Sequence, residues 1–258
     1  MTGKPKNETS ELMGGSKAVA PVAPKNVSVG AQQYAPAPGT EAIRSEDVTF
    51  PRLKVLQGTS TEVESGGNRP GQLFNTITGE TGSELEIIPL ALIPSRVLFN
   101  PDDNKGAPLA RTMDMTMCNH PEHGEEPVPI DECNHTKWHN NKPPVYTVVY
   151  NYPFLTPNDI NQNALPTVIS FMKSGITAAL NMNTLVKGKI PPIPFWNYVW
   201  KLTTVSKKFK KGTAFVPVLK HLRETTEDER KWCEMVYRQC VAGKVIDVPV
   251  EQDGGGDD

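Results

Sequence analysis

The alternation of hydrophobic and polar positions predicts a chain built mainly from β-strands. Strands are expected at residues 53–57, 72–77, 85–99, 146–152, 167–172, 195–205 and 212–219. Helical periodicity is found instead at residues 174–185 and 227–242, and the second stretch opens with Thr226 and Glu229 at the spacing of a capping box. From residue 85 onward, the expected order is strand, insertion, two strands, helix and two strands.

This order is that of an oligonucleotide-binding (OB) fold, a five-stranded Greek-key barrel with one helix between its third and fourth strands. We therefore expect a mainly β, OB-like nucleic-acid-binding domain at residues 43–222 and a C-terminal helix at 223–246. The loop between the first two strands borders the binding face of such a fold, and here it would carry a polar insertion at residues 100–144. Compositional bias predicts disorder at residues 1–42 and an acidic, flexible tail at 247–258.

Charge is distributed unevenly along the chain. Residues 160–223 contain ten Lys or Arg and no Asp or Glu, although the whole chain has 27 basic and 29 acidic residues. Seven aromatic residues share this block: Phe171, Phe195, Trp196, Tyr198, Trp200, Phe209 and Phe215. Cations interleaved with rings suit a single-stranded nucleic acid, whose phosphates need charge and whose unpaired bases need faces for stacking. The alternative is a solvated basic sheet packed beside an acidic part of the same fold.

The candidate DNA-binding residues are Lys173, Phe195, Trp196, Tyr198, Lys201, Lys207, Lys208, Lys210 and Lys211. The last four lie in the expected turn between the final two strands, where we expect phosphate contacts rather than an ordinary solvated turn. The strand at 195–205 leaves two possibilities, because alternate residues face opposite ways. In one, Trp196, Tyr198 and Trp200 form the core, while Phe195 and Lys201 face outward toward DNA. In the other, Trp196 or Tyr198 is itself a platform for a base.

Cysteine and histidine cluster within the insertion. Six candidate metal ligands fall within 22 residues: Cys118, His120, His123, Cys133, His135 and His139. Thiolate and imidazole are the ligands that zinc prefers, and a structural zinc takes four of them in a tetrahedron. Cys118 with His123 and Cys133 with His139 would close one site, but His120 or His135 could replace either histidine. We expect one structural Zn²⁺ per chain, ordering an insertion that has no core of its own; the alternative is a polar loop that happens to contain histidine.

Motifs of catalysis are missing from the sequence. It contains no phosphate-binding Gly-x4-Gly-Lys-Ser/Thr loop, no nucleophile elbow and no His-Glu-x-x-His. His120-Pro121-Glu122 matches the His-x-Glu of zinc deaminases, but the accompanying Pro-Cys-x-x-Cys is not present around Cys133. We therefore expect a protein that is not an enzyme. No apolar run approaches the roughly 20 residues of a membrane helix, so no membrane partner is expected, and the cysteine usage favours a reducing cytosol.

Several short segments are similar to those of a known family. They are residues 50–57 (FPRLKVLQ), 70–71 (PG), 78–80 (TGE), 169–171 (ISF) with 173–174 (KS), 191–194 (PPIP) through 200–204 (WKLTT), and the Cys118…Cys133…Trp138 insertion. Over about residues 48–220 the chain resembles the single-stranded DNA-binding proteins of tailed bacteriophages. The resemblance implies an OB-like barrel and sequence-tolerant binding of single-stranded DNA during replication or recombination. It also implies the cytoplasm of the infected bacterium as location, and an acidic tail that docks replication or recombination proteins.

Three functions are compatible with these sequence features. The leading interpretation is a non-catalytic protein that coats exposed single strands. The second is a zinc-stapled structural or adaptor protein of a phage particle or replisome, and the third is a zinc-dependent nuclease. Salt-sensitive binding to single-stranded homopolymers separates the first from the second, whereas loss of substrate that depends on a divalent metal favours the third.

Overall fold

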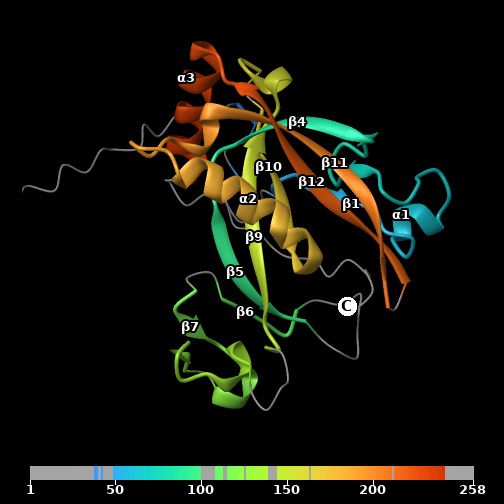
Figure 1. The fold of residues 1–258 in the computed structure, drawn as a ribbon, viewed down its shortest axis with the longest axis vertical. Helices are drawn as coiled ribbons and strands as arrows, with labels where there is room; N and C mark the ends of the chain where they lie inside the picture. Colours follow the sequence, from blue (N-terminus) through green and yellow to red (C-terminus); the bar gives the residue numbers. More distant parts are fainter. Residues whose placement is uncertain are drawn as a thin grey trace, which may run out of the picture. The chain divides into compact units, whose positions relative to one another are not determined.

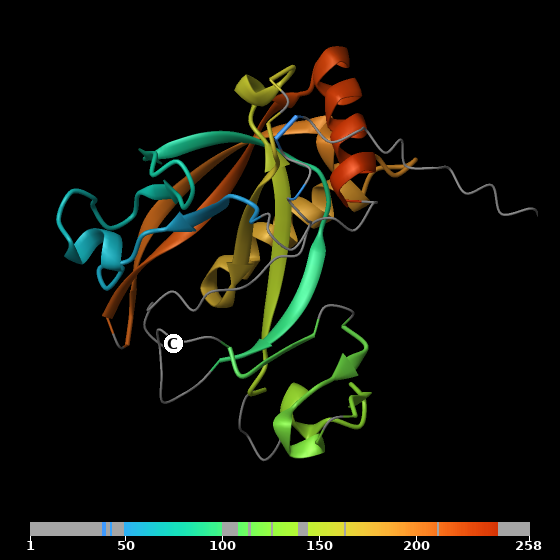
Figure 2. The same cartoon turned by 180° about the vertical axis from the view of Figure 1, so that it is seen from behind.

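The computed structural model describes residues 38–39, 42, 49–99, 108–112, 115–124, 126–138, 144–162, 164–210 and 212–241. All of them belong to one unit, residues 36–258. The expected disordered segment at 1–42 lies outside the described residues except for Pro38, Gly39 and Ala42, and the expected acidic tail at 247–258 lies outside them entirely. Figures 1 and 2 show the arrangement of the elements from two opposite sides.

Most of the regular structure is β. The strands are β1 (Arg52–Val55), β2 (Leu73–Asn75), β3 (Thr81–Gly82), β4 (Glu84–Pro89), β5 (Ile93–Leu98), β6 (Ala110–Thr112), β7 (Met117–Cys118), β8 (Val128–Pro129), β9 (Thr147–Leu155), β10 (Thr167–Met172), β11 (Tyr198–Phe209) and β12 (Gly212–Glu224). The α-helices are α1 (Thr61–Glu64), α2 (Ile176–Lys187) and α3 (Glu227–Val236). The short helical turns are η2 (Pro121–His123), η3 (Asn134–Thr136), η4 (Pro157–Asp159), η5 (Lys173–Gly175), η6 (Phe195–Asn197) and the π-helical η7 (Tyr237–Val241).

Ten strands of the described residues form one mixed sheet. Its hydrogen-bonded order is β12-β11-β4-β9-β10-β1-β2-β3, and β5 pairs with β9 and β6. Every pairing is antiparallel except that of β1 with β10, which places Arg52 opposite Val168 in a parallel ladder. Strands β7 and β8 form a separate two-stranded sheet within the insertion. The expectation of a mainly β chain with few helices is therefore confirmed.

The expected closed five-stranded barrel is not what these strands form. In such a barrel β10 would pair with β12, but here the edge of β10 is occupied by β1. The gap between β1 and β12 is bridged by the side chain of Gln57. Its Nε2 donates to the backbone oxygen of Phe215 at 2.9 Å, and its Oε1 accepts from the backbone nitrogen of Phe215 at 2.9 Å. The edge of β12 is thus joined to the segment after β1 by the amide of Gln57, whereas a closed barrel would have a ladder of backbone hydrogen bonds along this edge.

The main core lies between the sheet and α2. Ala179, Met182 and Val186 of α2 are buried against strand residues that include Tyr152 and Trp200. The hydroxyl of Tyr152 donates to Oδ1 of Asn183 at 2.7 Å, and burial raises the pKa of Tyr152 well above its usual value. The helix forms where the sequence predicts it, although the described helix begins at Ile176, after the short turn η5.

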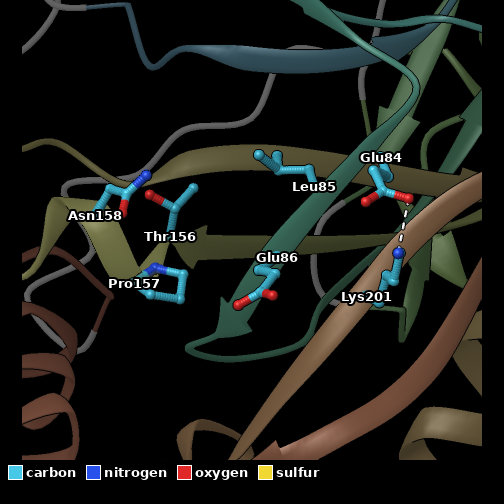
Figure 3. A pocket seen from close by; sticks show the side chains of 7 residues that line it. All are labelled: Glu84, Leu85, Glu86, Thr156, Pro157, Asn158 and Lys201. Atoms are coloured by element: carbon cyan, nitrogen blue, oxygen red, sulfur yellow. Dashed lines mark ion pairs between the residues drawn. The ribbon is translucent and has the colours of Figure 1, made fainter.

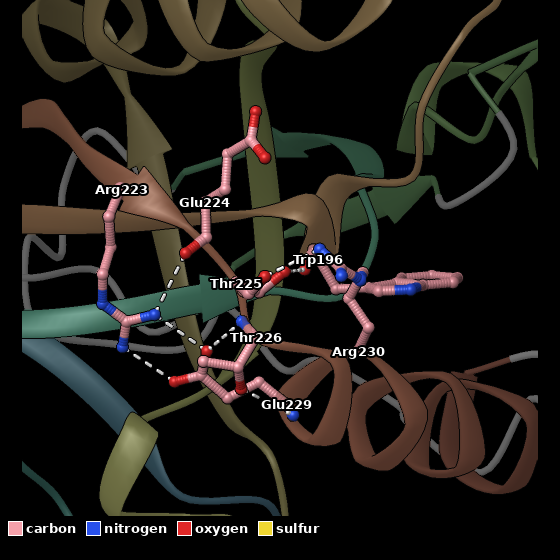
Figure 4. Close-up of polar contacts among 7 residues, drawn as sticks. All are labelled: Trp196, Arg223, Glu224, Thr225, Thr226, Glu229 and Arg230. Atoms are coloured by element: carbon pink, nitrogen blue, oxygen red, sulfur yellow. Dashed lines mark hydrogen bonds and ion pairs between the residues drawn. The ribbon is translucent and has the colours of Figure 1, made fainter.

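Helix α3 packs on the opposite side of β11, where Cys233 and Val236 join a cluster with Ile88 and Val199. The predicted capping box is confirmed: Thr226 and Glu229 exchange the two expected hydrogen bonds. Arg223 at the end of β12 donates to both carboxylate oxygens of Glu229 at 2.8 Å (Figure 4). These hydrogen bonds lower the pKa of Glu229 to about 2, and they tie the start of α3 to the end of the longest strand.

The start of β11 differs from the prediction. The strand begins at Tyr198, and residues Phe195–Asn197 form the helical turn η6. Side chains of a strand point alternately to opposite faces, whereas successive side chains of a 3₁₀ turn are separated by about a third of a turn. The alternation of β11 therefore cannot be extended back to Phe195. The prediction that Phe195 faces outward is therefore wrong: its ring packs against the main core and contacts Tyr152 edge-on, with ring centroids 5.8 Å apart.

Candidate nucleic-acid interface and metal cluster

The β11–β12 hairpin carries the densest positive charge of the described residues. Strand β11 pairs with β4 only from Trp200 to Thr203, so that the hairpin runs on beyond the end of β4 (Figure 1). Lys207, Lys208 and Lys210 are all exposed. Cross-strand neighbours near the tip are small or polar: Lys207 faces Ala214 and Lys208 faces Thr213. The free end of the hairpin therefore presents long basic side chains over residues that do not cover them.

These lysines have no neutralising partner among the described carboxylates. No described carboxylate forms an ion pair with Lys207, Lys208 or Lys210, whereas Lys54, Lys201 and Lys231 each pair with a glutamate. Phe209 lies between them and belongs to no core cluster of the described residues. Lys211 lies outside the described residues. An unneutralised set of lysines on a projecting hairpin attracts an anionic polymer.

Lys201 is in a different environment from the hairpin lysines. Its Nζ lies 2.7 Å from Oε2 of Glu84, at the rim of a cavity of about 410 Å³ (Figure 3). The same cavity is lined by Glu86 and by Thr156 and Asn158. A phosphate would have to displace Glu84 and approach a second carboxylate, so the structure does not bring Lys201 together with the hairpin lysines as a phosphate site.

The predicted stacking rings are packed into the protein. Tyr198 is 7% exposed in the main core. Trp196 packs against the α3 cluster and lies 4.9 Å from Tyr237 between ring centroids. Of the two possibilities for this strand, core positions for Tyr198 and Trp200 are confirmed, but Trp196 sits in η6 on the α3 side. Lys173 is exposed in η5, a turn that contacts β12.

The metal-ligand candidates divide into two groups. Cys118, His123 and Cys133 bring one ligand atom each to within 4.8 Å of one another, and so do His120, Glu122 and His135. His139 lies outside the described residues. The first group is the pairing that the sequence spacing favoured, minus its fourth member. This group contains the two cysteines of the insertion, Cys118 and Cys133, which are fully buried.

His123 provides the observation that fits a metal. Its Nε2 is buried and has no hydrogen-bond partner. An unsatisfied buried nitrogen costs about 1 to 3 kcal/mol, and a cation between it and the two sulfur atoms would satisfy it. The structure joins Cys118 and Cys133 as a disulfide, a state that leaves this nitrogen without a partner. Residues of the first group therefore fit a metal in the reduced protein.

The second group is satisfied without a metal. Nε2 of His135 lies 2.8 Å from Oε2 of Glu122, and Nδ1 of His120 accepts from the backbone nitrogen of Glu122 at 3.2 Å. The rings of His120 and His135 are stacked with centroids 3.6 Å apart. Burial lowers the pKa of His120, and repulsion from the nearby His135 lowers it further. These histidines support the loop around the first group, and Glu122 is a partner that the sequence spacing did not reveal.

A family model described as Pam3 phage gp34-like protein matches residues 19–245. The chain belongs to the Pam3 phage gp34-like family. The matched range includes every described strand and helix, so the hairpin, the insertion and α3 are all parts of this bacteriophage family. Comparisons with curated proteins and with solved structures gave no match.

Two further features of this phage protein bear on the site. None of the helices in the part of the chain that the structure describes has the length and apolarity needed to cross a membrane.

Trp138 is 71% exposed, unlike the aromatic residues that the sequence singled out for binding. Two signals in the sequence point to this residue: its position beyond Cys133 in a polar loop, and its place in the Cys118…Cys133…Trp138 insertion that carries the family resemblance.

Proposed function

We propose that this phage protein binds single-stranded DNA, without catalysis and with little sequence preference, in the cytoplasm of the infected bacterium. The observation that carries the proposal is the exposed, unneutralised lysine set of the β11–β12 hairpin. A polyanion gains affinity there because each neutralised phosphate releases condensed counterions. Replication or recombination is the setting in which a phage exposes such strands.

The strand order supports an OB-like relationship. Reading β12-β11-β4-β9-β10 as strands five, four, one, two and three gives the neighbour relations of an OB fold, with α2 between the third and fourth. In that correspondence the hairpin tip is the loop between strands four and five, and the insertion is the loop between strands one and two. These are the two loops that flank the nucleic-acid site of OB folds.

The burial pattern favours the loops over the sheet face as the contact surface. Asn151 on β9 is fully buried and hydrogen-bonds Ser95, Ser170 and the backbone oxygen of Ile93. Val168 on β10 is also fully buried, against Phe50. Strands that correspond to two and three are therefore covered here. The hairpin and the insertion remain as the exposed borders of a binding site, and both views place them toward the same end of the sheet (Figures 1 and 2).

We further propose that the insertion holds one structural zinc in the reduced protein. Cys118, His123 and Cys133 are the three described ligands, and His139 is the candidate for the fourth. Bound zinc supplies a tetrahedral cross-link between the two limbs of a loop. The orphaned Nε2 of His123 supports this reading over a disulfide, as does the reducing cytosol in which a phage replicates.

The lysine hairpin can be tested by its effect on salt dependence. Changing Lys207, Lys208, Lys210 and Lys211 to Ala should weaken binding to single-stranded homopolymers and flatten the log–log salt slope by up to about 3 units, at about 0.7 per phosphate contact. The matched control changes Lys231 and Arg238 to Ala, because both are paired with glutamates on α3 and its extension. The control should leave the slope nearly unchanged.

An unaltered slope in the four-lysine variant would remove the main support for this site. If the wild-type protein itself fails to bind single strands, the zinc-stapled adaptor becomes the better account. Loss of the oligonucleotide during the titration, dependent on a divalent metal, would instead indicate a nuclease.

A further inference from the structure

We infer that Trp138 is a base-stacking platform of the single-stranded DNA site, on the opposite border from the lysine hairpin. The inference rests on the proposed function and names a contact within it. Trp138 is the most exposed large hydrophobic aromatic among the described residues, with 71% of its surface accessible. Tyr198 and Trp200 are 7% and 2% exposed, and Trp196 and Trp232 pack into the α3 cluster.

Hydrogen bonds anchor the segment that leads to this ring. Thr136, two residues earlier, is buried, and its hydroxyl is within 3.0 Å of the backbone oxygens of Ile130 and Cys133. Nη1 of Arg96 donates to the backbone oxygen of Thr136 at 3.3 Å. The backbone nitrogen of Val145 donates to the oxygen of His135 at 2.9 Å, which joins the far limb of the loop. An exposed indole on an anchored backbone loses little freedom when a base stacks on it.

Chemistry favours a base rather than a phosphate as the partner of this loop. Residues 100–144 carry eight acidic and four basic side chains, so the insertion as a whole repels a polyanion. The segment next to the ring, residues 137–142 (KWHNNK), contains two lysines and no acid. What Trp138 offers is an aromatic face, and any unpaired base has a face to place on it. The paired bases of a duplex are stacked on one another and do not offer one.

The hairpin and Trp138 then contribute different parts of the binding free energy. Lysines of the hairpin supply the ionic part of the affinity, and Trp138 supplies stacking that does not depend on salt. The ring also links DNA binding to the metal cluster, because Trp138 lies five residues beyond Cys133. A loosened cluster should release the platform while leaving the hairpin in place.

The experiment titrates oligothymidylate into the full-length protein, the Trp138→Ala variant and the Trp138→Phe variant, with binding and intrinsic fluorescence measured together. We expect Trp138→Ala to weaken binding about 5- to 150-fold, the range for loss of one base stack. The salt slope should not change, because a lost stack releases no ions. Trp138→Phe should retain most of the affinity. Wild-type emission should be quenched on binding, and the quenching should vanish in both variants.

A second measurement separates the platform from a merely structural ring. In the Cys118→Ser background, which disrupts the cluster, Trp138→Ala should add little further loss, since the platform is already released. Wild-type protein that binds while Trp138→Ala binds equally well overturns the inference and leaves the proposed function standing; the exposed ring would then be a protein-docking residue. Wild-type protein that does not bind overturns the proposed function, and the inference with it.

Discussion

The insertion and the β11–β12 hairpin are both projections from the same sheet, but they are held in opposite ways. The hairpin is a long ladder in which Tyr198 to Phe209 pairs with Gly212 to Glu224, with one register shift between Val199 and Trp200. The insertion has only the two-residue strands β7 and β8, and its small core consists of Cys118 and Cys133 with Leu98 and Tyr146. Backbone pairing stabilises the first, and side-chain cross-linking must stabilise the second.

The difference has a functional consequence. A hairpin tip held by backbone pairing is free to carry a row of lysines, because the pairing of Lys207 and Lys208 with Ala214 and Thr213 does not depend on what the lysine side chains contact. An insertion fixed by a few side chains cannot change them without losing its shape. Substitutions should therefore act on charge and salt dependence in the hairpin, and on folding and metal content in the insertion.

The largest effect is expected at the metal cluster. Cys118→Ser should abolish zinc binding, with about one zinc per chain in the wild type, and should loosen the insertion while the sheet stays folded. Elemental analysis and hydrogen exchange of residues 108–146 would measure both results. Cys240→Ser, on the turn after α3, serves as the control and should keep the metal. Wild-type protein purified without chelator under reducing conditions and containing no zinc would contradict the prediction.

The next effect tests the outer half of the hairpin, where Phe215 pairs with Ser206 near the tip. Gly71 has φ of +87°, and a Cβ there would lie 2.4 Å from Cδ1 of Phe215 on β12. Gly71→Ala should lower the free energy of unfolding by about 2 to 4 kcal/mol, from backbone strain of about 1 to 3 kcal/mol plus the displaced ring. Gly58→Ala is the matched control, since nothing lies within 4 Å of its Cβ and its φ is not in the left-handed region. Equal stability of the two variants in denaturant titrations would show that Phe215 does not pack here.

A smaller effect is expected from the ion pair that ties β12 to α3. Because hydrogen bonds from Arg223 lower the pKa of Glu229 to about 2, its stabilisation is fully present above about pH 4.5 and is lost as the pH falls toward 2. Glu229→Gln should lower the free energy of unfolding at pH 7 by about 1 to 3 kcal/mol, allowing for the partly exposed arginine. The difference from wild type should shrink below pH 4. A difference that stays constant from pH 7 to pH 3 would assign the loss to packing instead.

The smallest effect concerns the acidic tail, whose placement lies outside the described residues. Residues 247–258 contain five acidic side chains, enough to compete weakly with DNA for the hairpin. Deleting them should tighten binding to single strands by a few-fold at low salt and hardly at all at high salt, because screening weakens the competition. Unchanged affinity at low salt would argue that the tail serves partner proteins alone.

The order of the elements could be predicted because it follows from local signals. Strand and helix periodicities set β9, β10, α2 and β12, and the Thr226–Glu229 spacing set the start of α3. The place of β1 could not be predicted, because its parallel pairing with β10 joins residues more than a hundred positions apart. The predicted orientation of Phe195 is wrong because the alternation of side chains in a strand does not extend through Phe195–Asn197, which form a helical turn.

The candidate site was predictable in its charges and not in its rings. Four lysines within five residues can be recognised from the sequence alone, whereas burial of Tyr198 and exposure of Trp138 depend on the tertiary packing around them. The ligand spacing identified the metal cluster but left six residues competing for it. Only the structure separates His123, with its unpartnered nitrogen, from His120 and His135, which are engaged with Glu122 and with each other.

We propose that the hairpin makes this phage protein a single-stranded DNA-binding protein. The most direct test of this proposal is one titration series of the full-length protein with a single-stranded oligonucleotide and with the duplex of the same sequence, repeated over a range of salt concentrations. We expect tighter binding to the single strand at every salt concentration, with a log–log slope of about −2 or steeper, equivalent to three or more phosphate contacts. Equal affinity for strand and duplex, or no salt-dependent binding to either, would contradict it.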